Sequence, residues 1–189
     1  LIPESTLRKL LTEGRSVVDL FELFQEKLAY PIFGESAGYR LGYQIQPLKG
    51  NNKGCDSFAV SSLQSDIDTG DSDNEISPKN AGAVYRLLGN IDIAEKLGGK
   101  SLARLKPTSG SVLYGSSNAQ LGASLKSGDP RGDGQEAIIA GAPGIDSVIV
   151  FYPDTQPQEL SDLNGVNGFI MKGLPGSLSG TAVVVFNDS

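Results

Sequence analysis

The side chains left for chemistry in this chain are carboxylates and lysines, because the sequence contains no histidine and a single cysteine, Cys55. The lack of histidine excludes Ser-His-Asp and Cys-His catalysis and His-ligated zinc. One cysteine excludes an internal disulfide. No pattern of carboxylates or lysines indicates catalysis, so the sequence predicts a protein that is not an enzyme and has no catalytic residues.

The densest group of carboxylates lies between Ser65 and Glu75, and consists of Asp66, Asp68, Asp71, Asp73 and Glu75. Such a stretch can bind calcium or contact a basic partner. It can equally be a solvated loop inserted between two strands. The sequence leaves these alternatives open.

Charge and composition narrow the class of protein. The net charge of −6 lacks the basic surface that nucleic-acid binding requires, so no nucleic-acid partner is expected. No apolar run approaches the ~20 residues of a membrane-spanning helix. The 24 Gly and 10 Pro favour short strands and turns over long helices.

An internal repeat is the strongest signal in the sequence. At an offset of 80 residues, from Leu41 to Leu121, the stretches 41–63 and 121–143 align without a gap. Each contains an apolar strand, a glycine-rich polar loop and a second apolar strand. An insertion at residues 64–79 lengthens the first copy.

A second offset, of 58 residues, places Gly110, Gly115 and Gly122 on Gly168, Gly173 and Gly180. The strands that close the units also correspond, at residues 82–87 and 146–151. A β unit of this length, with four short strands, is typical of a propeller blade. The sequence predicts blade units at 36–89 and 107–153, with the start of a third unit at 165–189.

Residues 128–143 carry the most specific motif, Gly-Asp-Pro-Arg-Gly-Asp-Gly-Gln-Glu followed by an apolar strand and Gly-Ala-Pro. This motif resembles the FG-GAP repeat of integrin-α-type β-propellers, and residues 163–170 resemble the linker between such repeats in bacterial surface proteins. The repeats of glycosylphosphatidylinositol phospholipase D are similar. The resemblance implies a mainly β fold, a partial β-propeller of about two and a half blades at residues 31–189, behind an N-terminal α-helical segment at residues 1–30.

The resemblance also implies a calcium loop, in which side-chain oxygens at alternate positions and one backbone carbonyl converge on the ion. Its predicted ligands are Asp129, Asp133, Gln135 and Glu136, with Arg131 at a position that has lost its oxygen. The cofactor is therefore either none or one weakly bound Ca²⁺. Alternatively, Arg131 bridges Asp129 and Asp133 in place of the ion.

The corresponding loop of the first unit has Lys49 and Lys53 where the second has Asp129 and Asp133. Two lysines repel a divalent cation, so no calcium is expected there. The tripeptide Arg131-Gly132-Asp133 also matches an integrin ligand, but the repeat already accounts for its glycine and aspartate.

The N-terminal segment does not match the repeat. An apolar face at Val17, Leu20, Phe21, Phe24 and Leu28 predicts a helix. Ser16 is its expected N-cap, with Asp19 three residues on. This helix either packs on the propeller, joins it to an upstream domain, or docks its Phe21 and Phe24 side chains into a partner.

Together these patterns predict a non-catalytic protein-binding, adhesion or scaffold module of a larger secreted or surface-associated protein. Its expected location is extracellular or the cell surface. Its expected partners are other proteins or the remainder of a longer chain. The alternatives are an accessory propeller of a secreted hydrolase and a structural subunit of a fixed multi-protein assembly.

Overall fold

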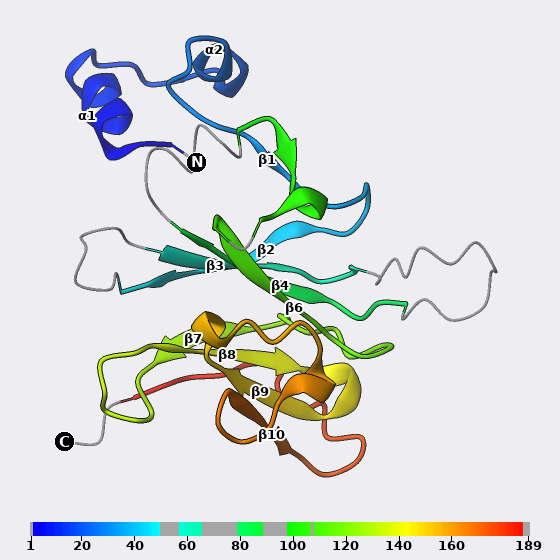
Figure 1. The fold of residues 1–189 in the computed structure, drawn as a ribbon. Helices are drawn as coiled ribbons and strands as arrows, with labels where there is room; N and C mark the ends of the chain where they lie inside the picture. Colours follow the sequence, from blue (N-terminus) through cyan, green and yellow to red (C-terminus); the bar gives the residue numbers. More distant parts are fainter. Residues whose placement is uncertain (1, 50–56, 66–78, 89–97, 107, 187–189) are drawn as a thin grey trace.

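The computed structural model describes residues 2–49, 57–65, 79–88, 98–106 and 108–186. These residues form two short helices followed by three small sheets, so the predicted mainly β fold with a helical N-terminus is confirmed (Figure 1). No closed propeller ring is present in this part of the chain.

The two helices are α1 (Glu4–Thr12) and α2 (Leu20–Gln25). The prediction of Ser16 as N-cap is wrong, because the Asp19 side chain accepts a hydrogen bond from the Phe21 backbone N–H at 2.8 Å and caps α2. Helix α2 buries Leu23, whereas Phe21 is 66% exposed.

The predicted apolar face of this helix is also wrong at its end. Helix α2 stops at Gln25, and Lys27 takes a left-handed conformation with φ of 57°, so Leu28 leaves the helical register. The Leu28 carbonyl instead accepts a hydrogen bond from the Thr6 hydroxyl at 2.9 Å. This bond joins the end of the α2 segment to α1.

The first sheet is a four-stranded antiparallel meander that follows chain order. Its strands are β2 (Leu41–Leu48), β3 (Ser57–Ser62), β4 (Ala83–Leu88) and β6 (Gly110–Tyr114). Side chains alternate between its two faces, as the period of two in a strand requires. Val84 therefore packs toward the second sheet, while Tyr85 packs on the opposite face.

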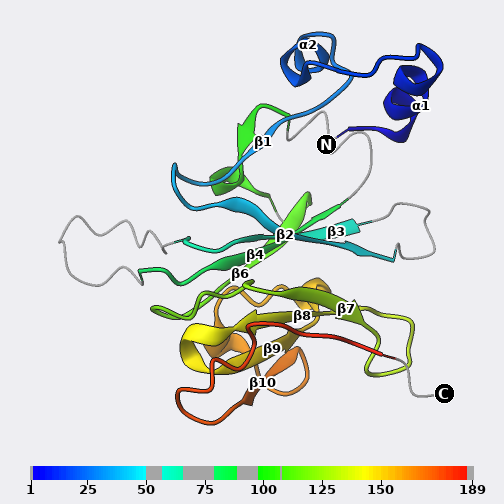
Figure 2. The same ribbon diagram turned by 180° about the vertical axis from the view of Figure 1, so that it is seen from behind.

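The second sheet repeats this topology. Its strands are β7 (Leu125–Gly128), β8 (Ala137–Ala142), β9 (Ser147–Phe151) and β10 (Gly168–Lys172). Short 3₁₀ helices η2 (Pro143–Ile145), η3 (Pro153–Thr155) and η4 (Leu160–Asp162) lie in its connections. The two sheets stack face to face (Figures 1 and 2).

The largest core of the molecule lies between the two sheets. Its buried members are Leu48, Ala59, Val84, Leu113, Ala119, Leu121, Leu125, Ile138, Ala140, Ala142, Ile149 and Phe151, each at most 5% exposed. Burying one such large aliphatic side chain stabilises a fold by about 1.5–3 kcal/mol, so this face-to-face contact holds the sheets together.

A further layer covers the other face of the first sheet. It contains β1 (Ile32–Phe33), which pairs in parallel with β5 (Lys100–Ser101), and the 3₁₀ helix η1 (Leu102–Arg104). Leu102 is buried against the first sheet in a cluster with Tyr85 and Leu87. The two α-helices lie beyond this layer, at one end of the stack (Figures 1 and 2).

The sequence repeats and the sheets are out of phase. The offset of 80 carries β3 onto β8, and the offset of 58 carries β6 onto β10. However, β6, with which the second sequence unit begins, is the fourth strand of the first sheet, and β10 is the fourth strand of the second. The domain limits read from sequence stay a prediction, since each sheet runs past the end of its sequence unit.

Candidate functional site

The predicted calcium loop, residues 129–136, is closed by its own backbone. The Asp129 carboxylate accepts hydrogen bonds from the backbone N–H groups of Asp133, at 3.3 Å, and Gly134, at 2.7 Å. Asp133 in turn accepts a bond from the N–H of Gln135 at 2.9 Å. The Gly134 N–H contributes most to lowering the pKa of Asp129 below its usual value, since these bonds favour the charged carboxylate.

Glu136 does not join these carboxylates. Its side chain accepts a hydrogen bond from the backbone N–H of Lys49 in the first sheet's loop, at 2.6 Å. In the described part of the chain, no group of three or more acidic or sulfur-containing side chains is close enough to hold a metal ion. The arrangement of residues 129–136 therefore does not fit a calcium ion as it stands, and the four predicted ligands stay a prediction for calcium titration.

Arg131 does not bridge Asp129 and Asp133, as one alternative expected. Its guanidinium lies 3.7 Å from the centre of the Tyr152 ring, and it donates a hydrogen bond to the Val166 carbonyl. Cation–π stacking is worth about 0.5–2 kcal/mol and here ties the loop to the connection before β10. The Arg131 side chain is thus bound to other residues of the protein and does not project freely from the Arg131-Gly132-Asp133 tripeptide.

That connection is fixed by two asparagines. The Asn164 side chain accepts bonds from the N–H groups of Val166 and Asn167, at 2.9 and 3.1 Å, and Asn167 accepts one from the Asn164 N–H at 2.9 Å. Such side-chain to backbone bonds hold a loop in one conformation. Of the other predicted loop positions, residues 51 and 53 and the acidic stretch 66–75 lie outside the described residues.

Sequence reasoning missed a backbone conformation that occurs three times. Each copy, termed here the left-handed turn, has a positive φ at every second residue of a five-residue stretch. The residues are Gly38, Arg40 and Gly42; Asn118, Gln120 and Gly122; and Gly176, Leu178 and Gly180. Positive φ is uncommon outside glycine, so three matching copies at the offsets of 80 and 58 indicate one repeated structural element.

The hydrogen bonds around the second and third turns also correspond. Before the second turn, the Gly115 N–H donates to the Gly82 carbonyl at 2.9 Å, and before the third the Gly173 N–H donates to the Asp146 carbonyl at 2.7 Å. Within the turns, the Ala119 N–H donates to the Ser116 carbonyl at 2.9 Å, and the Ser177 N–H donates to the Leu174 carbonyl at 3.0 Å. Asp146 adds two side-chain bonds to the third turn, from the N–H groups of Gly176 and Leu178.

Each of these two turns presses a glycine against the preceding sheet. A Cβ at Gly122 would lie 2.4 Å from the Ser61 Cβ, and one at Gly180 would lie 2.3 Å from the Ser147 carbonyl oxygen. Beyond the third turn, a Cβ at Gly128 in β7 would lie 2.8 Å from Val185. Residues 178–186 therefore lie on the second sheet as residues 120–128 lie on the first.

The outer face of the second sheet, called here the open face, is covered only in part within the described residues, since Ile139 and Val150 are 7% and 4% exposed while the side chains of β10 stay accessible. A groove of about 640 Å³ runs over it, lined by Gly128, Asp129, Pro130, Ile139, Val150, Phe169, Met171, Val184, Val185 and Phe186. Phe169 and Met171 are 42% and 47% exposed, and Phe186 is 80% exposed. Exposed apolar side chains gathered in one groove mark a surface that contacts another molecule.

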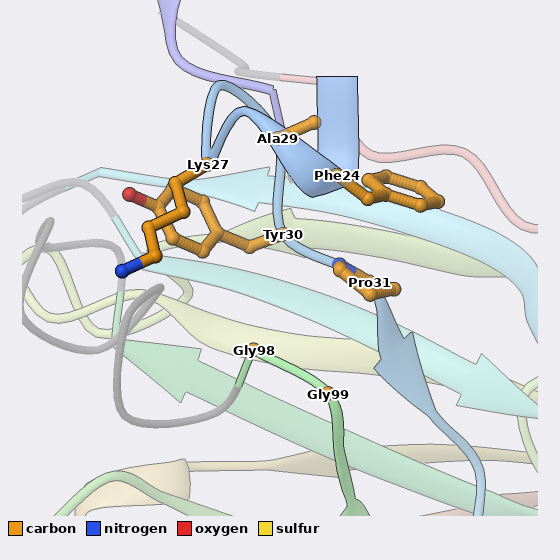
Figure 3. A pocket seen from close by; sticks show the side chains of 7 residues that line it. All are labelled: Phe24, Lys27, Ala29, Tyr30, Pro31, Gly98 and Gly99. Atoms are coloured by element: carbon orange, nitrogen blue, oxygen red, sulfur yellow. The ribbon is translucent and has the colours of Figure 1, made fainter. Parts of the chain in front are cut away.

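A second cavity, of about 460 Å³, lies between the end of α2 and the start of β1 and β5. It is lined by Phe24, Lys27, Ala29, Tyr30, Pro31, Gly98 and Gly99 (Figure 3). Lys27 is the charged side chain of this lining. The cavity has mixed walls with no convergent set of polar groups, unlike a built ligand site.

A buried polar cluster joins the N-terminal layer to the first sheet. The Tyr114 hydroxyl donates a hydrogen bond to the Glu35 carboxylate. The buried hydroxyls of Tyr85 and Ser65 face the same place and lie near Glu35, but among the described residues neither of them meets the geometry of a full hydrogen bond. Burial raises the pKa of Tyr85 and of Tyr114, which keeps both phenols neutral.

Comparison with known proteins adds no family to this geometry. No protein-family model matches the chain, and no curated protein matches it in sequence. Within the described residues, no helix has the length and apolar character needed to cross a membrane.

Proposed function

We propose that this chain is a segment of an integrin-α-type propeller, in which the first and second sheets are adjacent blades. In such an arrangement the first strands of neighbouring blades lie side by side. Strands β2 and β7 do so, since the Gln46 side chain donates a hydrogen bond to Ser127 at 3.2 Å. Residues 178–186 are then the first strand of a third blade, whose other strands cover the open face.

The function that follows is a non-catalytic protein-binding, adhesion or scaffold module of a larger secreted or surface-associated protein. The observation that carries this proposal is the open face itself. The corresponding face of the first sheet, at Ala59, Val84 and Leu113, is completely covered by the second sheet. An apolar face with the same design therefore takes protein as its cover.

A fixed multi-protein assembly is the second candidate, and the N-terminal helices favour it. Leu11, Val17 and Phe21 are 80%, 84% and 66% exposed on these helices. Apolar side chains at both ends of one stack suit a subunit that has a neighbour at each end.

The size of the native particle tests the proposal. Native mass spectrometry of the protein from its host is expected to give a particle heavier than the 19.8 kDa of this chain. Phe169→Glu places a charge on the open face and is expected to release or loosen the covering protein, while Val166→Glu, at a 70% exposed position in the connection before β10, serves as the matched control. A native particle that contains this chain alone, with its open face exposed, would contradict the proposed function.

A further inference from the structure

Strand β1 occupies the same place in the chain as β6 and β10. Each of these three strands is followed directly by a glycine, namely Gly34, Gly115 and Gly173, although the glycine after β1 stands one residue further from its turn than the other two. A left-handed turn follows each glycine in all three cases. In the second and third cases, the strand before the turn is the fourth strand of a four-stranded sheet.

The pairing of β1 supports the same equivalence. Phe33 of β1 pairs in parallel with Ser101, and Tyr114 of β6 makes a parallel bridge with Glu159. Ser101 and Glu159 each stand immediately before a 3₁₀ helix, η1 and η4, in the connection between the third and fourth strands of a sheet. Strand β1 therefore relates to the first sheet as β6 relates to the second.

The difference lies on the other edge of the strand. Strand β6 pairs there with β4, and β10 pairs with β9, both antiparallel. Within the described residues β1 has no such partner, since its sheet contains only β1 and β5. Phe33 is 55% exposed, and an unpaired strand edge presents backbone groups that another strand can bind.

We infer that β1 is the fourth strand of an additional blade, whose first three strands come from protein outside the described residues. The inference rests on the proposed function. The expected occupant is a three-stranded antiparallel sheet of the same repeat. Its last strand pairs antiparallel with β1 and has the alternating aliphatic character of β4 and β9. The chain then carries two complete blades between a fourth strand at one end and a first strand at the other.

In this arrangement, each end of the chain completes a blade whose other strands come from elsewhere. Within the described residues, the blade to which β1 would belong shows its fourth strand, and the third blade shows its first. The two α-helices lie beyond the β1–β5 layer and contribute no strand to it (Figures 1 and 2). The N-terminal end therefore binds a strand along the edge of β1, and the C-terminal end binds an apolar sheet on the open face.

Site-specific photo-crosslinking in the native host tests the two ends separately. The benzophenone amino acid p-benzoylphenylalanine replaces Phe33 in one sample and Phe186 in a second. A third sample carries it at Val166, 70% exposed in the connection before β10, as the control for random contact. The crosslinked peptides are sequenced by mass spectrometry.

The inference expects the probe at position 33 to crosslink to a strand of alternating aliphatic residues from outside residues 1–189, and the Val166 control to give no such product. Crosslinks at 186 without any at 33 overturn the inference and leave the proposed function standing. Crosslinks at 33 alone support the inference and count against a third blade on the open face. The absence of both products, or a product at 33 from within this chain, overturns the inference.

Discussion

The two sheets have the same topology and the same strand order, but they differ in how their faces are covered. The first sheet has the N-terminal layer on one face and the second sheet on the other. The second sheet has a partner on one face, whereas within the described residues its open face is covered in part by residues 178–186. Each four-stranded sheet in this molecule therefore shares much of its core with a neighbouring layer, as expected for repeats that bury apolar surface by stacking.

The largest expected effect compares equivalent positions on the two faces. Leu113 in β6 and Met171 in β10 are related by the offset of 58, and they are 0% and 47% exposed. Leu113→Ala is expected to lower the free energy of unfolding by about 3 kcal/mol, because it leaves a cavity between the sheets. Met171→Ala is expected to lower it by less than about 1 kcal/mol. Urea denaturation measures both, and equal losses would show that the open face is covered in the isolated chain.

The second test compares two turn glycines with the same conformation. Gly122 and Gly42 have φ of 91° and 88°, but only Gly122 is pressed against a neighbouring side chain, while Gly42 has open space. Gly122→Ala is expected to cost about 2–3 kcal/mol, from backbone strain together with overpacking. Gly42→Ala is expected to cost about 1 kcal/mol, from strain alone. A thermal melt of each variant separates the two contributions, and similar melting temperatures would contradict the close packing at Gly122.

The third test uses the strained leucine of the third turn. Leu178 has φ of 52° and is exposed, so Leu178→Gly removes strain of about 1 kcal/mol without loss of packing. It is expected to slow hydrogen exchange in residues 180–186 while leaving exchange in the first sheet unchanged. Gln120→Gly, the matched change between the sheets, is expected to raise the melting temperature of the whole chain. Faster exchange of residues 180–186 in Leu178→Gly would mean that the leucine side chain holds this segment.

A smaller effect is expected when the loop at residues 129–136 is acidified. The pKa of Asp129 is lowered by the bond from the Gly134 N–H, so this contact stabilises the loop above the unfolded pKa of about 3.9. The stabilisation is lost as the pH falls through the lower pKa of the folded state. Amide exchange at Gly134, measured by NMR with intrinsic rates subtracted, is expected to become faster over that range. Asp129→Asn is expected to abolish this dependence on pH, and its persistence would assign it to another group.

Calcium is expected to have the smallest effect. The carboxylates of Asp129 and Asp133 already accept backbone N–H groups, and Glu136 is bound to Lys49. Millimolar calcium or a chelator is therefore expected to leave the melting temperature unchanged. A rise of many degrees with calcium, absent in Asp129→Asn, would show that the loop rearranges into a metal site.

Much of the fold was predictable from the sequence, because it depends on local patterns. Alternating apolar residues predicted β3 and β8 as equivalent strands of the two repeats, and glycine spacing predicted the equivalence of β6 and β10. The phase of the sheets was not predictable from the motif, since backbone pairing decides which sheet a strand joins. Residues 128–143 lie entirely within one sheet and its loops and do not mark where that sheet ends.

The loop side chains were harder to predict than the strands, because their partners lie far away in sequence. Arg131 stacks on Tyr152, and Glu136 bonds to Lys49 of the other sheet. No spacing rule within residues 128–143 anticipates such contacts. The left-handed turns could have been found by aligning Gly38, Asn118 and Gly176, since asparagine tolerates that conformation better than most residues.

The left-handed turn has a consequence for how such a gene grows. The second turn joins β6, the fourth strand of the first sheet, to β7, the first strand of the second, and carries the glycine that presses on the earlier sheet. A duplicated stretch one repeat long, wherever its breakpoints fall, contains one full set of strands and one turn. The added unit thus arrives with its own matching contact surface, and the array can lengthen by duplication without inventing a new interface.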